Sequence, residues 1–80
     1  MITREVLIGW VLEALGALGG SGHVPEVARE IWKRHEAELR TAGDLFYTWQ
    51  YDMRWAAQKL RDARKLTYGR YRGRQVWQLI

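Results

Sequence analysis

The 80-residue chain contains no cysteine, no asparagine, one proline and two histidines. Without cysteine it can form neither disulfides nor cysteine-ligated zinc sites, and it cannot use a thiol nucleophile, which favours a reducing, cytoplasmic setting. His23 and His35 are too few to supply the three or four ligands of an ordinary zinc site. We therefore expect no metal and no other cofactor.

Long apolar runs are missing as well. The longest apolar stretch, residues 6–18, is interrupted by Glu13 and is shorter than the roughly 20 residues that a membrane span needs. No segment has the pattern of a signal peptide. The sequence thus predicts a soluble protein with no membrane partner.

Recognisable catalytic sets are absent too. The sequence shows no carboxylate pair at catalytic spacing and no Ser–His or Cys–His set, and the glycines of residues 19–22 lack the Lys-Ser/Thr of a phosphate-binding loop. We expect this chain to be no enzyme. Its 48% hydrophobic content is ample for the core of one domain covering residues 1–80.

Positive charge is concentrated in the second half of the chain. Residues 1–40 carry five Lys and Arg against six Glu, whereas residues 41–80 carry eight Lys and Arg against three Asp, a net charge of +5. Such asymmetry is typical of proteins that bind nucleic acid or another anionic surface. An ordinary solvated face would give the same count, so charge alone leaves both interpretations open.

The order of expected elements predicts an α+β fold. Residues 3–18 form a helix capped by Thr3, glycines end it, and a short extended piece leads to Pro25 and a second helix reaching residue 39. A third helix, capped by Thr48, runs to residue 63 or 64. Strands at residues 65–68 and 75–80 flank a turn at residues 69–74. This is the winged helix-turn-helix order, in which the third helix commonly enters the major groove of DNA.

Helical periodicity divides the third helix into two faces. The inward stripe is apolar, as are alternate positions of the last strand, and we expect both to form the core: Trp49, Met53, Ala56, Ala57, Leu60, Ala63, Trp77 and Leu79. Phe46 or Tyr47 is expected to pack at the entrance of the helix.

The opposite stripe of that helix has the composition of a surface that reads a DNA groove. Gln can bond adenine and Arg can bond guanine through two hydrogen bonds each. The stripe and its flanks comprise Gln50, Tyr51, Arg54, Trp55, Gln58, Arg61, Asp62 and Lys65. Trp55 also fits a second interpretation, in which it packs beneath another element.

The expected turn between the strands is rich in arginine. Arg70, Arg72 and Arg74 surround Tyr71, and alternate positions of a hairpin point to the same side. Three arginines on one side would form a row that contacts phosphates or enters a minor groove. A merely solubilising turn is the alternative.

Residues 48–66, followed by a hairpin ending in V-W-Q-L, resemble the N-terminal winged-helix domain of Mrr-type restriction proteins. The matching residues are Trp49, Met53, Arg54, Trp55, Ala56, Leu60, Leu66, Arg72, Gly73, Trp77 and Leu79. Arg64 stands where that family usually has glycine. The resemblance implies a double-stranded DNA-binding module of a restriction-modification or defence system, reading methylated DNA with bases such as N6-methyladenine.

The chain stops directly after its last expected strand, which suggests a minimal domain cut from a longer protein. The resemblance implies that such a parent protein also carries a nuclease domain. The competing function is protein interaction, because many winged helices bind proteins. In that interpretation Tyr51 and Trp55 dock a partner.

Overall fold

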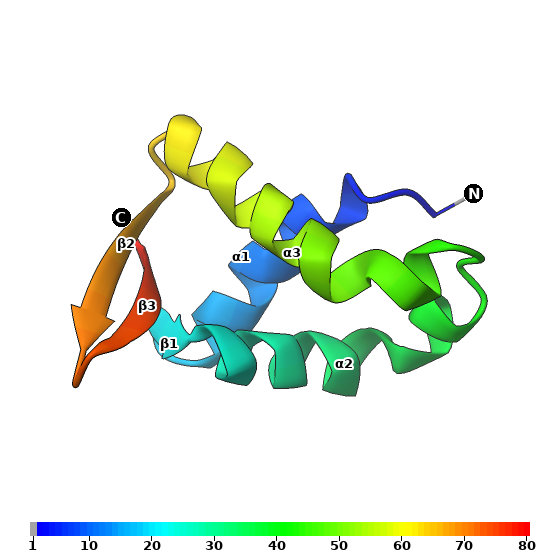
Figure 1. The fold of residues 1–80 in the computed structure, drawn as a ribbon, viewed down its shortest axis with the longest axis horizontal. Helices are drawn as coiled ribbons and strands as arrows, with labels where there is room; N and C mark the ends of the chain where they lie inside the picture. The colour runs from blue at the N-terminus through cyan, green and yellow to red at the C-terminus, as the bar shows by residue number, and fades with distance from the viewer. Residues whose placement is uncertain (1) are drawn as a thin grey trace.

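The computed structural model describes residues 2–80. Its elements, in chain order, are α1 (Val6–Ala17), β1 (Ser21–His23), α2 (Val24–Arg40), α3 (Leu45–Asp62), β2 (Leu66–Tyr71) and β3 (Arg74–Leu79). The strands form an antiparallel sheet in the order β1-β3-β2. The sheet lies at one end of the molecule, and α2 and α3 spread apart toward it from their joining loop (Figure 1). The α+β class is confirmed, and the layout is compatible with a winged helix.

The core lies where the three helices meet one face of the sheet. The side chains that are less than 2% exposed include Leu7, Val11, Leu15, Val27, Ile31, Leu39, Met53, Leu66 and Trp77. No polar or charged residue within the described part of the chain is buried. Burial of apolar surface therefore supplies the main stabilisation of the fold.

The first two helices differ little from expectation. α1 begins at Val6, whose N–H bonds the carbonyl of Thr3 at 3.1 Å, so the expected start at Thr3 was early. α2 begins next to Pro25, and the carboxylate of Glu26 accepts the N–H of the capping residue His23 at 2.9 Å. This bond satisfies a helix-terminal donor that would otherwise lack a partner.

The start of α3 corrects the sequence interpretation. The helix begins at Leu45, because Leu45 is buried at 7% exposure and anchors the first turn in the core. Thr48 is not the cap but an interior residue, and its hydroxyl donates to Asp52 Oδ2 at 2.7 Å. Ala63, expected in the core, is exposed because it lies at the C-cap, beyond the last helical residue Asp62.

The hairpin is tighter than expected. Tyr71 pairs with Arg74, which leaves Arg72 and Gly73 as the turn, with φ angles of 54° and 78°. Two positive φ angles define a type I′ turn, whose twist matches that of the strands. The broad turn expected at residues 69–74 was therefore wrong, and residues 69–71 continue β2.

Candidate nucleic-acid interface

One exposed stripe runs along the full length of α3. Its members recur at intervals of four and three residues: Tyr47, Tyr51, Arg54, Gln58 and Arg61. Tyr47 and Tyr51 are 83% and 76% exposed. Because this spacing follows the helical repeat, the five side chains lie on one face, which we call the α3 outer face.

The structure distinguishes the two glutamines near this face. Gln58 accepts the hydroxyl of Tyr68 at 3.3 Å and donates to Asp62 Oδ1 at 3.0 Å, so both ends of its amide are engaged. The Gln50 side chain makes no hydrogen bond within residues 2–80. Gln50 therefore has the amide that is free to bond an external edge, whereas Gln58 joins α3 to β2.

Trp55 does not belong to the α3 outer face. It is half-buried, packs against the core, and carries the guanidinium of Arg4 over its ring at 4.0 Å from the centroid. Lys59 approaches the same ring at 5.7 Å. Of the two interpretations left open for Trp55, the structure supports packing beneath another part of the chain, here the segment before α1.

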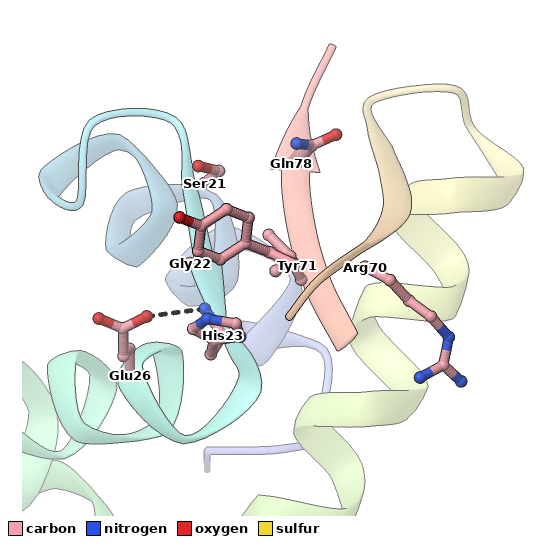
Figure 2. Close-up of a pocket in the computed structure, with 8 residues that line it drawn as sticks. Ser21, Gly22, His23, Glu26, Arg70, Tyr71 and Gln78 are labelled. Atoms are coloured by element: carbon pink, nitrogen blue, oxygen red, sulfur yellow. Dashed lines mark hydrogen bonds between the residues drawn. The ribbon is translucent and has the colours of Figure 1, made fainter. Parts of the chain in front are cut away.

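The arginines of the hairpin do not form one row. Arg70 pairs with Gln75 and Tyr71 with Arg74, so Arg70 lies on one face of the sheet while Tyr71 and Arg74 lie on the other. Figure 2 shows the Tyr71 ring over β1 and Arg70 extending in the opposite direction. Arg72 occupies the turn itself, and its guanidinium lies 5.4 Å from the Tyr71 ring centroid.

Arg70 shares its sheet face with Tyr68, which contacts α3. The Arg61 guanidinium lies 4.8 Å from the Tyr68 ring centroid, and the Tyr68 hydroxyl reaches Gln58. Burial raises the pKa of Tyr68 above its ordinary value, while the charge of Arg61 opposes this shift. The C-terminal half of α3 and the hairpin are thus joined into one surface that includes Arg61 and Arg70.

The other sheet face has an open pocket of about 350 Å³. Tyr71 and His23 line it, with ring centroids 6.3 Å apart, and Val76 is a further lining residue. The His23 ring nitrogen Nδ1 lies 3.3 Å from the carbonyl of Gln75, and no bond between Ser21 and His23 occurs in the described chain.

Ion pairs are confined to the first half of the described chain. Those found in residues 2–80 lie within α2, where Arg34 pairs with Glu30, Arg40 with Glu36 and His35 with Glu38, or join α2 to α1, where His35 pairs with Glu13. The basic residues of α3 and the hairpin, including the exposed Lys65 just after α3, have no carboxylate within 4.0 Å in that part of the chain. Their positive charge is consequently available to an external anion.

An apolar groove separates α2 from α3. Its volume is about 460 Å³, and Trp32, Phe46 and Trp49 line it together with Gln50. Trp49 stacks on Trp32 at 6.1 Å between centroids, and the Arg40 guanidinium lies 5.3 Å from the Trp32 ring centroid. Because these neighbours already pack on the Trp32 ring, the groove is poorly suited to stacking a base.

The predicted burial of Trp49 is confirmed, and the structure decides between Phe46 and Tyr47, which the sequence left as alternatives. The sequence left open whether Phe46 or Tyr47 packs at the helix entrance, and in the structure Phe46 packs toward Trp32 while Tyr47 is exposed. The signal for the exposure of Tyr47 was present, since Tyr47 precedes Tyr51 by one helical turn. It was hidden because the helix start was placed at Thr48.

None of the helices formed by residues 2–80 is both long and apolar enough to cross a membrane. Within the same residues no three metal-ligating side chains come together. Comparisons of the chain with protein-family models, with curated proteins and with solved structures found no match. The geometry of the α3 outer face and the hairpin is therefore the basis for a functional proposal.

Proposed function

We propose that this chain is a winged-helix module that binds double-stranded DNA through the α3 outer face and the β2–β3 hairpin. One observation carries the proposal: an exposed stripe of Tyr and Arg along α3 is joined through Tyr68 to a hairpin whose arginines have no carboxylate partner in the described chain. An α-helix with its side chains is about 10–12 Å across, which fits the roughly 12 Å width of the major groove.

In this proposal the polar groups divide into two kinds of contact. Gln50 and Arg54 bond base edges, since Gln suits adenine and Arg suits guanine. Arg61, Lys65, Arg70 and Arg72 contact phosphates, which position the protein without reading sequence. Gln58 has a positioning role, because its amide accepts the hydroxyl of Tyr68 and donates to Asp62 within the protein.

We further propose that the module reads a methylated base such as N6-methyladenine. Tyr51 supports this part, because an exposed aromatic ring beside Gln50 and Arg54 would place apolar surface next to hydrogen-bonding groups. The edge of a methylated base in the major groove likewise has an apolar methyl group next to hydrogen-bonding atoms. The restriction or defence context, and a nuclease domain in a parent protein, rest on the family resemblance alone.

Salt dependence of binding tests the DNA proposal. If three to five phosphates are contacted, the plot of log affinity against log salt has a slope of about −3 to −5. The same duplex should be tested unmodified, N6-methylated on adenine and C5-methylated on cytosine. An affinity that does not change between low and moderate salt would refute DNA binding, and equal affinities for the three duplexes would refute only the modified-base part.

The second candidate is a protein-interaction module that docks a partner through Tyr51. The 76% exposure of that ring and the neighbouring apolar groove favour it. Trp55, the other residue of this hypothesis, is covered in part by Arg4 and offers less surface. A partner that binds with little salt dependence, while duplex DNA does not bind, would support this candidate, because counterion release accompanies phosphate contacts.

A further inference from the structure

Two arginines have backbone conformations that arginine rarely adopts. Among residues 2–80, the non-glycine residues with positive φ are Arg64 at 60° and Arg72 at 54°. In this left-handed region the Cβ of an L-residue crowds the backbone, so glycine or asparagine is energetically cheaper. Both strained positions fall in the basic half of the chain, and both are occupied by the same side chain.

Arg64 ends α3 at the position where glycine is usual. The N–H of Lys65 bonds the carbonyl of Leu60 at 2.9 Å, which is the long-range bond of a Schellman motif with Arg64 in the left-handed position. The Arg64 side chain is exposed and makes no hydrogen bond, ion pair or cation–π contact within the described residues. No polar or cation–π contact of its side chain in the described chain therefore offsets the strain.

The helix dipole does not explain Arg64 either. Positive charge near the end of a helix is favourable, but the last turn of α3 already contains Lys59 and Arg61. A third positive charge would add repulsion to these two. A residue kept in a strained conformation without an internal benefit indicates a functional role.

Arg72 is the corresponding case in the hairpin. It occupies the first central position of the type I′ turn, where asparagine or glycine is favoured, and Gly73 follows it. Its one aromatic neighbour in the described part of the chain is Tyr71, at 5.4 Å. The two arginines lie near opposite ends of β2, whose six residues span about 20 Å at 3.3 Å each.

We infer that Arg64 is a phosphate-binding residue, and that Arg64 and Arg72 are two anchors for the DNA backbone near opposite ends of the hairpin. The inference rests on the proposed DNA-binding function and adds to it a site at the end of α3. A guanidinium binds a phosphate through paired hydrogen bonds. Lys65 and Arg70 lie between the two anchors along the chain. Four basic residues spread over this part of the chain fit a linear polyanion, such as the DNA backbone, better than a single small anion.

The test compares Arg64→Gly with Arg64→Lys. Arg64→Gly removes both the strain and the charge, so the melting temperature should rise while duplex affinity falls about fivefold to tenfold and the log–log salt slope flattens by about one unit. Arg64→Lys keeps the charge and the strain, and it should retain the parent's slope and melting temperature. Arg34→Ala, which removes an arginine already paired with Glu30, is the matched control and should leave the slope unchanged.

Each alternative outcome has a distinct meaning. If Arg64→Gly melts below the parent, the arginine is kept for folding and the inference is overturned. It is equally overturned if Arg64→Gly binds duplex DNA with the parent's affinity and slope. If the parent itself shows no salt-dependent DNA binding, the proposed function fails and the phosphate anchors fail with it.

Discussion

The indole of Trp10 and the imidazole of His35 stack face to face, with ring centroids 3.9 Å apart and planes 6° from parallel. His35 Nε2 lies 2.6 Å from Glu13 Oε1 on α1, and its Nδ1 lies 2.8 Å from Glu38 Oε1 on α2. His35 is also the point at which α2 departs from helical geometry, with φ −129° and ψ 19°. One side chain thus joins α1 to α2 at the kink in α2.

This arrangement predicts pH-dependent stability. Burial of the ring by itself lowers the pKa of His35, but the hydrogen bonds and negative charges of Glu38 and Glu13 raise that pKa above its ordinary value. Because the folded state holds the proton more tightly, the stabilisation is complete below the ordinary pKa of about 6.5 and is lost as pH rises through the folded-state pKa. We expect the melting temperature to fall over that range.

The double variant Glu13→Gln with Glu38→Gln tests whether the two glutamates raise the pKa of His35. It removes both negative charges, so burial should dominate and the pKa of His35, followed by NMR titration, should drop relative to the parent. His35→Gln should in turn flatten the pH dependence of the melting temperature. A parent imidazole that titrates below its ordinary pKa would contradict the assignment.

The buried tryptophans are expected to be structural. Trp49 and Trp77 are 6% and 1% exposed, and replacing either with Ala should cost about 3–5 kcal/mol of unfolding free energy. That loss approaches the total stability of a small domain. Tyr51→Ala, on the α3 outer face, should change stability by no more than about 0.5 kcal/mol. Urea denaturation followed by circular dichroism measures all three, and similar midpoints for them would show that the faces are misassigned.

The two faces of the hairpin are expected to contribute unequally to DNA binding. Arg70→Ala should weaken binding to all duplexes alike and flatten the salt slope by about one unit, because one phosphate contact is lost. Arg74→Ala removes the same charge from the opposite sheet face and should leave the slope close to that of the parent. Equal effects of the two substitutions would mean that net charge, and not position, determines binding.

Tyr51 is expected to discriminate methylated from plain duplexes. Tyr51→Ala should keep the fold and the salt-sensitive affinity for any duplex, yet lose the preference for the methylated one. Tyr71→Ala is the control, since Tyr71 is 59% exposed on the sheet face opposite Arg70. Loss of the preference in both variants, or unfolding of Tyr51→Ala, would remove Tyr51 from the proposed reading surface.

The sequence by itself determined the helices, the hairpin and the apolar stripe of α3. These follow from periodicity, since Trp49, Met53 and Leu60 recur at helical spacing whatever packs against them. The concentration of positive charge in residues 41–80 was likewise visible from composition. The helices, the hairpin and the apolar stripe are visible in the sequence because each depends on residues that are close together along the chain.

Only the tertiary structure decided which residues of the predicted outer face of α3 are available to a ligand. Trp55 is covered by Arg4, and Gln58 is bonded to Tyr68, contacts between residues that are distant in sequence or belong to different elements. α3 begins at Leu45, which is buried. The sequence analysis took Thr48 as the N-cap and so left Leu45 outside the helix. Long-range partners determine exposure, and the spacing within a single helix does not reveal them.

The hairpin arginines show most clearly what the sequence could not determine. The sequence placed Arg70, Arg72 and Arg74 at alternate positions and so on one side, which holds only within a continuous strand. The structure puts a two-residue turn between Tyr71 and Arg74, so the chain reverses and the register places Arg70 and Arg74 on opposite faces. Side chains alternate with a period of two, and the length of the turn therefore decides which arginines lie beside α3.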